Sequence, residues 1–428
     1  MYKYFILFIL SVSILNAIPN TTILDDFKSH TQSFKPFLQF IKPYKFNSSN
    51  LFKNYYKPWS NKHLVKKNDI KWVFKLFKYK KGYSENYYHF SAKEAEYIIK
   101  NYNYYNFGKI KKNAISLNLL HLRVFPTDKP FTLSPEKAGE GLPFDYFQNS
   151  SIHSNSPIQV LNKSLDKEWV FVANNNVYGW VKEKEIAYIS EKQKNIIKKS
   201  KKAFILEDKT TLINKKNDIF LTKVNIGTVL PIFKINKQNT IVLVANSDIN
   251  HNLIFSKSFI ENSKYSKKPL KFNKKNVSFI LNQLLGINYG WGGIYNNRDC
   301  SSTLKDYFFI FGKILPRNSY QQSKIGKRLK LPEIEFNKIK FIKKNGIPFR
   351  TLIHKKGHIL LYIGYIDNKI FVFHNIWGIK YYDINNIEKR EIIGGSVITT
   401  LNIGSEFLKL NSKNSILLND IDTINIIK

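Results

Sequence analysis

One cysteine and two histidines are the residues of this chain whose types and order could carry out covalent chemistry. Cys300 is the only cysteine in the 428 residues, and His358 and His374 follow it. A nucleophilic thiolate needs a base that takes up the thiol proton, and the base needs a polar partner that holds its orientation. These residues therefore predict a cysteine peptidase with Cys300 as its nucleophile. A buried structural cysteine is the competing interpretation.

The sequence around Cys300 predicts how the thiol is positioned. Residues 276–285 and 302–309 have the apolar spacing of helices, which end at Gly286 and Gly312. Cys300 is therefore expected near a helix N-terminus. There the helix dipole, together with a nearby imidazolium, is expected to lower the thiol pKa from its usual value of about 8.5.

Both histidines are expected on strands, because His358 opens the apolar run 359–363 and His374 closes the run 370–373. His354 and His358 have a spacing that could bind zinc on a helix. Gly357 and the run after it favour a strand instead, and the sequence has neither a matching third ligand nor an HExxH motif. We therefore predict no metal site and no cofactor.

Aromatic and basic residues near Cys300 each have two interpretations. Tyr289, Trp291 and the pair Gly292-Gly293 could be core aromatics and a tight turn, or could shape a cleft wall where glycine lets the substrate backbone approach closely. Arg317 could be a surface charge, or could receive a substrate carboxylate through two parallel hydrogen bonds.

Several short motifs resemble the NlpC/P60 cell-wall peptidases. They are Trp291-Gly292-Gly293, Asp299-Cys300-Ser301-Ser302, Leu315-Pro316-Arg317-Asn318-Ser319 with Gln321, and residues 357–364, GHILLYIG. Upstream, residues 144–146, 169–172 and 178–181 resemble a bacterial SH3 domain that precedes the catalytic domain in one multidomain subgroup, and residues 55–59 resemble that subgroup's N-terminal stabilising segment. The resemblance implies an α+β protein in which two SH3-like β-barrels and a helical N-terminal segment precede a papain-like NlpC/P60 catalytic domain.

The resemblance also implies roles for the catalytic residues. His358 corresponds to the general base, which pairs with Cys300 and later protonates the leaving amine. His374 corresponds to the polar residue that holds the tautomer of the base, and its neighbour Asn375 is an alternative for this role.

A substrate-binding wall is implied beside the nucleophile. In the subgroup, residues at the positions of Asp299 and Ser301, with a tyrosine from the SH3 domain, close one end of the cleft and bind a free N-terminal amine. Tyr146 is the first choice for that tyrosine, and we also expect Trp291 and Arg317 to bind substrate. Asp299 could instead only cap the helix that follows it.

The chain is expected to contain several units. Ser91 and Glu94 form a capping-box pattern at the start of a helix, and short strand-like runs such as 204–206, 220–224 and 240–244 suit small β-barrels, with a turn at 225–227. The expected boundaries are a signal peptide at 1–17, a stabilising segment at 18–112, SH3-like barrels at 113–192 and 202–262, a catalytic domain at 270–404 and a polar tail at 405–428.

Charge and the N-terminus indicate where the protein works. The net charge of +37 comes from lysines spread through nearly every segment, with no nucleic-acid-binding module, so we expect no nucleic-acid partner. The charge favours peripheral contact with the anionic envelope. Residues 1–17 carry Lys3 and an apolar run ending at Ala17, which predicts a signal peptide and a periplasmic or secreted monomer.

The expected function is hydrolysis of the γ-D-glutamyl bond to a diamino acid in peptidoglycan stem peptides through an acyl-enzyme. The bond class is implied by the resemblance. Two alternatives stay open: a catalytically silent murein-binding protein, and another amidase or acyltransferase with the same fold. A hydrophobic cleft in place of one closed by Asp299 and a tyrosine would favour the last alternative.

Overall fold

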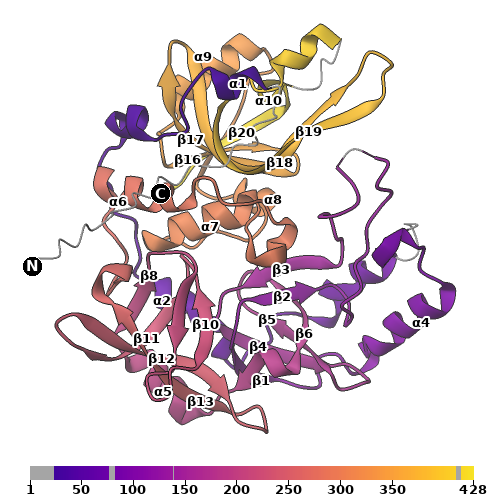
Figure 1. Cartoon of the computed structure of the whole chain (residues 1–428), viewed down its shortest axis with the longest axis vertical. Helices are drawn as coiled ribbons and strands as arrows, with labels where there is room; N and C mark the ends of the chain where they lie inside the picture. Colours follow the sequence, from indigo (N-terminus) through magenta and orange to yellow (C-terminus); the bar gives the residue numbers. More distant parts are fainter. Residues whose placement is uncertain (1–23, 77–81, 138, 411–415) are drawn as a thin grey trace, which may run out of the picture.

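The computed structural model describes residues 24–76, 82–137, 139–410 and 416–428. Within these residues the chain forms a seven-stranded sheet, a five-stranded sheet with a separate two-stranded ribbon, and a six-stranded sheet with helices on both faces (Figure 1). This mixture confirms the α+β prediction. No helix in the described ranges is long and apolar enough to cross a membrane. The signal peptide expected at 1–17 lies outside them.

The first β unit is the seven-stranded sheet, in the order β3-β2-β6-β5-β4-β1-β7. Trp180, Phe171 and Val170 are buried on its strands, which gives this small unit its own core. Its strands are β1 (Lys112–Ser116), β2 (Leu120–Arg123), β3 (Gln148–Ile152), β4 (Pro157–Lys163), β5 (Trp169–Ala173), β6 (Tyr178–Lys182) and β7 (Ile186–Tyr188).

The second β unit follows the helix α5 (Glu191–Lys199), which begins with a capping box from Ser190 to Gln193. Its five-stranded sheet has the order β13-β12-β11-β8-β14, and β9 pairs with β10. The strands predicted at 204–206, 220–224 and 240–244 correspond to β8, β10 and β12. The strands are β8 (Lys202–Ile205), β9 (Thr210–Ile213), β10 (Phe220–Val224), β11 (Val229–Ile235), β12 (Asn239–Ser247), β13 (Leu253–Glu261) and β14 (Tyr265–Ser266).

The third unit, which carries Cys300 and both histidines, is built on the sheet β15-β20-β16-β17-β18-β19. Its elements are α6 (Lys274–Leu284), η8 (Trp291–Asn296), α7 (Cys300–Ile310), α8 (Ser319–Gln322), β15 (Lys327–Lys330), α9 (Glu335–Asn345), β16 (Thr351–Lys355), β17 (His358–Ile366), β18 (Lys369–Tyr382), β19 (Glu388–Thr400), η9 (Ser405–Leu410), α10 (Leu417–Asp420) and β20 (Ile421–Ile426). Both predicted helices are present, as α6 and α7.

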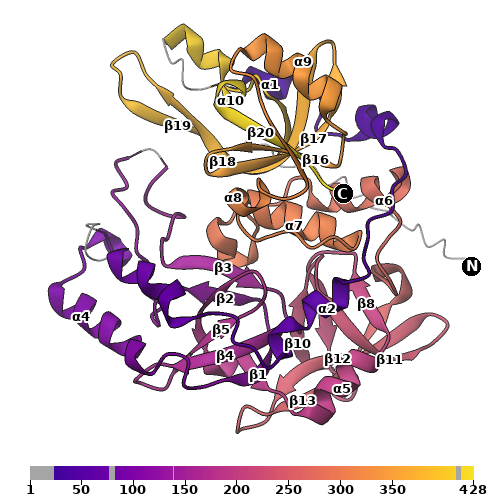
Figure 2. The ribbon, with the colours of Figure 1, turned by 180° about the vertical axis from the view of Figure 1, so that it is seen from behind.

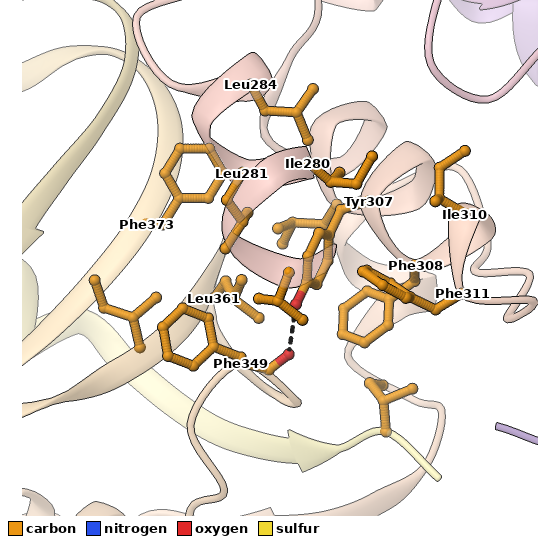
Figure 3. Packing of buried hydrophobic residues seen from close by; sticks show 14 of the residues in the cluster. Ile280, Leu281, Leu284, Tyr307, Phe308, Ile310, Phe311, Phe349, Leu361 and Phe373 are labelled. Atoms are coloured by element: carbon orange, nitrogen blue, oxygen red, sulfur yellow. Dashed lines mark hydrogen bonds between the residues drawn. The ribbon is translucent and has the colours of Figure 1, made fainter. Parts of the chain in front are cut away.

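The core of this unit lies between α6, α7 and one face of the sheet (Figure 3). Leu281 and Phe308 from the helices pack in the same cluster as Phe373 and Leu361 from the strands, and all four are fully buried. Tyr307 donates a hydrogen bond of 3.1 Å to the carbonyl of Phe349, which satisfies its buried hydroxyl. The packing fixes α7, and with it Cys300, against the strands that carry the histidines.

The N-terminal segment connects the third unit to the first (Figure 2). Phe34 and Phe37 are buried in the core beside α7, whereas Trp59 packs with the first unit and donates a hydrogen bond of 2.8 Å to the carbonyl of Ala114. Its elements are α1 (Asp25–Lys28), η1 (Lys35–Phe40), α2 (Leu51–Tyr55), η2 (Lys57–Trp59), η3 (Lys67–Phe74), η4 (Glu85–Tyr87), α4 (Ala92–Asn101) and η5 (Tyr104–Asn106). The predicted capping box of Ser91 and Glu94 starts α4.

The C-terminal residues differ from the predicted polar tail. Residues 421–426 form β20, which pairs with β15 on one side and β16 on the other. Ile421, Ile424 and Ile426 are buried there, and Asn425 is also fully buried because its amide donates to the carbonyls of Ser323 and Ile325. The asparagine-rich composition concealed a central strand, so the third unit extends through residue 426.

Candidate active site

The candidate nucleophile occupies the first residue of α7. Cys300 is the N1 residue of this helix and 7% exposed, and the side chain of Asp299 caps the helix by accepting a hydrogen bond of 2.9 Å from the backbone N–H of Ser302. Asp299 therefore caps α7 as predicted, although capping is not its only contact. The predicted position of Cys300 at a helix N-terminus is confirmed as well.

Asp299 has a second partner that the sequence did not reveal. Arg317 donates to both of its carboxylate oxygens, at 2.9 and 2.6 Å, and also to the hydroxyl of Ser301 at 2.9 Å. Burial alone would raise the pKa of Asp299, but the Arg317 guanidinium lowers it overall. Arg317 is only 6% exposed, so it is not a surface charge, and the carboxylate it binds in this structure belongs to Asp299.

The environment of the thiol differs from the expectation of a lowered pKa. Burial raises the pKa of Cys300 to about 12, and the negative charge of Asp299 acts in the same direction. The backbone N–H of Ile359 donates toward the thiol and opposes this shift, without reversing it. Desolvation therefore outweighs the helix dipole, and the thiol is neutral at pH 7. The contact with Ile359 also places Cys300 beside the start of β17, next to His358.

Next to Cys300, a line of three hydrogen-bonded side chains crosses β17, β18 and β19. Nε2 of His358 lies 2.8 Å from Nδ1 of His374, and Nε2 of His374 lies 3.0 Å from Oγ1 of Thr399. His358 opens β17, His374 lies within β18 and Thr399 lies in β19. Burial lowers the pKa of His358 to about 3 and holds the pKa of His374 well below its usual value, so both rings are neutral.

Asn375, the alternative third residue, points elsewhere. Its amide donates to the carbonyl of Arg298 at 2.8 Å and to Thr303 Oγ1 at 3.4 Å. Alternation along β18 sends adjacent side chains to opposite faces of the sheet, so Asn375 reaches the residues around α7 while His374 meets His358.

The strand predicted at His354 is present. His354 lies in β16, where it pairs with Ile359 of β17, and its ring lies 2.8 Å from Asp422. Two histidines on neighbouring antiparallel strands do not have the geometry of a helical i, i+4 zinc pair. Among the described residues, no three histidine, cysteine or acidic side chains are grouped so that they could hold a metal ion.

Aromatic residues from two units gather near the nucleophile. Trp291 lies 5.3 Å from Phe144 and 6.0 Å from Tyr146 between ring centroids, and Trp377 of β18 lies 5.9 Å from both Phe144 and Tyr289. Burial raises the pKa of Tyr289, and the proximity of Cys300 and Asp299 adds to this rise. The Tyr146 hydroxyl donates a hydrogen bond to Glu140. No hydrogen bond connects Tyr146 to Asp299.

The two glycines after Trp291 serve a different contact from the one expected. Gly292 and Gly293 have φ of +58° and +90°, and a Cβ on either would lie 2.6 Å from the Gln148 carbonyl or 2.4 Å from Ser151 Oγ. Gln148 also donates a hydrogen bond of 3.0 Å to the Gly292 carbonyl. These glycines therefore let β3 of the first unit approach the loop.

Two residues near the site were not found from the sequence. Thr399 carries no signal, because a threonine in an apolar strand is common. Arg390 of β19 lies 5.9 Å from the Phe144 ring and close against Gly139, and its side chain forms no hydrogen bond or ion pair with any described residue. Burial lowers the pKa of Arg390 overall. Glu388 and Glu140 lie near enough for their charges to oppose this shift, but neither carboxylate forms an ion pair with it. Its half-buried guanidinium can therefore bind an anion that enters from outside.

Comparisons with known proteins agree with this architecture. A family model for an SH3 domain of the SH3b1 type matches residues 130–182. No protein with a curated description matches the sequence. An NlpC/P60 endopeptidase from Photobacterium damselae subsp. piscicida is similar over 93% of this chain and 97% of its own, with 25% identity and a TM-score of 0.84.

A second solved structure, an NlpC/P60 family protein from Bacillus cereus ATCC 10987, has 16% identity, a TM-score of 0.48 and coverage of 73% of this chain and 98% of its own. The first neighbour extends over nearly the whole chain, and the SH3 match lies in the unit that contacts the Trp291 loop. The chain is therefore similar along nearly its whole length to an NlpC/P60 endopeptidase, and it contains an SH3 domain of the SH3b1 type.

Proposed function

We propose that this protein is a secreted cysteine peptidase that hydrolyses the γ-D-glutamyl bond to a diamino acid in peptidoglycan stem peptides. The observation that carries the proposal is the line from Thr399 through His374 to His358, which ends beside Cys300. A structural cysteine would not require three aligned polar side chains next to it. The intact line also argues against a silent murein-binding protein.

The neutral thiol and the neutral imidazole determine the first step. Nε2 of His358 is engaged with His374, which leaves Nδ1 to take the proton of Cys300 as the sulfur attacks the γ-carbonyl carbon. The C–N bond then breaks, and His358 returns the proton to the leaving amine. Water next attacks the thioester with His358 as base, which releases the γ-carboxylate and restores the thiol. We propose His374 as the residue that orients His358.

The test is mass spectrometry of a defined stem tripeptide incubated with the protein and with Cys300→Ala. We expect the native protein to release the alanyl-glutamate dipeptide and the free diamino acid, and Cys300→Ala to release neither while its unfolding temperature stays close to native. Hydrolysis by Cys300→Ala at the native rate would exclude this mechanism. A native protein that binds the peptide without cleaving it would support the murein-binding alternative, and activity only on other acyl compounds would support an amidase or acyltransferase.

We also propose how the substrate is recognised. Oδ2 of Asp299 accepts only the hydrogen bond from Arg317, so it keeps a lone pair for the free amine of the first residue, beside the hydroxyl of Ser301. We propose Tyr146, which packs against Trp291, as the tyrosine that completes this end of the cleft. Trp291 supplies an apolar wall. Since Arg317 is committed to Asp299, Arg390 is the better candidate for a substrate carboxylate.

Replacement of Arg390 tests this assignment. Arg390→Ala should raise KM for the acidic stem about tenfold, since a charged hydrogen bond contributes about 1.5–3 kcal/mol, and should leave kcat nearly unchanged. Lys389→Ala, which removes the exposed neighbouring charge, is the matched control. A KM that changes equally in both variants would mean that only general charge matters.

The proposed location is the cell envelope, where a monomer with a net charge of +37 would associate peripherally with anionic material. N-terminal sequencing of the mature protein should give Ile18. Recovery of protein that still begins at Met1 from the cytoplasm would contradict this location.

A further inference from the structure

We propose that Arg298 is a positioning residue for the reaction and that Asp208, from the second β unit, holds it in place. This inference rests on the proposed function and extends it, because a β unit without any catalytic group would then influence the rate. A buried ionic cluster, formed by Arg298, Asp208, Asp306 and His153, lies where the three units meet.

The side chain of Arg298 is shared between two units. Its Nε donates to Asp306 at 2.8 Å, within α7, and its Nη2 donates to Asp208 at 2.8 Å and to the carbonyl of Ile226 at 3.1 Å. Nη1 donates to the other oxygen of Asp208. Arg298 is 6% exposed, and Asp306 is 1% exposed. The guanidinium therefore joins the second unit to α7 in one fixed geometry.

The backbone of Arg298 leads directly to the candidate active site. It immediately precedes Asp299, the cap of α7, and its carbonyl accepts hydrogen bonds from Asn375 at 2.8 Å and from Gly290 at 2.9 Å. Asn375 adjoins His374. A displacement of Arg298 would therefore move the start of α7 relative to the strand that carries His374.

The first unit completes the cluster. His153 Nε2 lies 2.8 Å from Oδ1 of Asp306, which also accepts from Lys305 at 2.8 Å. Gly227 of the second unit has φ of +99°, and a Cβ there would lie 2.7 Å from both Asp306 Oδ1 and His153 Nε2. The turn predicted at 225–227 thus needs glycine for close approach to this cluster as well as for its backbone conformation.

The charges of the cluster depend on one another. Burial alone would lower the pKa of Arg298, but Asp208 and Asp306 raise it. Without the Asp208 charge, Asp306 would be the only carboxylate in contact with the buried guanidinium. Asp306 also interacts with His153 and Lys305. The loop from Gly290 to Asp299 would then relax. A displacement of about 1 Å at a nucleophile can cost about 10²-fold in rate.

The experiment compares Asp208→Asn with Glu207→Gln in the full chain. The two residues are adjacent, but Glu207 makes only a 3.7 Å contact with Lys264 within the second unit. We expect Asp208→Asn to lower kcat on the stem tripeptide about 10²-fold per folded molecule with KM within twofold of native. Glu207→Gln should leave both unchanged.

A second measurement separates this inference from the proposed function. The rate of alkylation of Cys300 by iodoacetamide requires no peptidase activity, and it should fall about tenfold in Asp208→Asn because His358 no longer takes up the thiol proton efficiently. If the native protein does not cleave the tripeptide but alkylation still depends on Asp208, the proposed function fails and the positioning role stands.

Native kcat and native alkylation in folded Asp208→Asn would overturn the inference, and so would equal effects of Glu207→Gln. If Asp208→Asn does not fold, the same measurements are made on Asp208→Glu, which keeps the charge but shifts it by one methylene. An intermediate loss of kcat and of alkylation rate is expected there, and native values would overturn the inference.

Discussion

At the scale of single residues, the tautomers of two histidines decide whether a base is available to Cys300. If Nδ1 of His358 is to accept the thiol proton, its ring proton must be on Nε2, which then donates to Nδ1 of His374. The proton of His374 is then on Nε2 and donates to Oγ1 of Thr399. Thr399 thus fixes the tautomer of His358 indirectly, through its hydrogen bond with His374.

This relay makes Thr399 a test of the proposed mechanism. Thr399→Val keeps the shape of the side chain but removes the acceptor, so His374 loses the partner that selects its tautomer. We expect kcat on the stem tripeptide to fall about tenfold, less than the 10²–10⁴-fold expected for loss of the base in His358→Ala.

Thr399→Ser is the matched control, since it keeps the hydroxyl and loses only a methyl group. It should retain most of the native kcat. Equal losses in the valine and serine variants would assign Thr399 to packing alone.

At the scale of elements, the loop that precedes α7 is shaped by contact with β3 as much as by its own sequence. Gly292→Ala would add both the strain of a positive φ and a clash with the Gln148 carbonyl. Gly108 has φ of +83° with open space around its Cβ position, so Gly108→Ala carries the strain alone.

The comparison of these two variants isolates the contact between the units. Strain at a positive φ costs about 1–2 kcal/mol, so Gly108→Ala should lower the free energy of unfolding by about that amount. Gly292→Ala should lower it further and should also reduce kcat. Equal unfolding free energies of the two variants, measured by urea denaturation, would show that β3 moves to accommodate the added methyl group at little cost.

The sequence predicted local elements better than it predicted long-range partners. Residues 220–224 were recognised as a strand from their own pattern, and Cys300 was placed at a helix start because residues 302–309 have helical apolar spacing. Arg317 was not recognised as the partner of Asp299, since only the folded chain brings them together. The strand at 421–426 was missed because its isoleucines at 421, 424 and 426 do not alternate regularly and lie among polar residues.

At the scale of the whole molecule, the first β unit limits what can reach Cys300, because Phe144 and Tyr146 contact Trp291. We propose that a stem with a free L-alanine amine is cleaved, whereas a stem still attached to muramic acid is a poor substrate. The amide is neutral, and its sugar would collide with the first unit. Arg317 already neutralises the charge of Asp299 when no substrate is bound, so exclusion of the sugar is the main reason.

Rates on the free tripeptide and on the intact muropeptide check this prediction. We expect kcat/KM to be at least tenfold higher for the free peptide, a difference of about 1.4 kcal/mol. Comparable values would mean that the protein acts on the wall itself.

The position of β20 has a consequence for biosynthesis. This strand lies inside the sheet between the edge strand β15 and β16, yet it is translated after every other strand of that sheet. While the ribosome is still adding residues 421–426, one edge of β16 is unpaired, and the core into which Phe34 and Phe37 pack is incomplete. The third unit can therefore complete its sheet only after residues 421–426 have been synthesised and have emerged from the ribosome, so its folding depends on the last of its strands to be made.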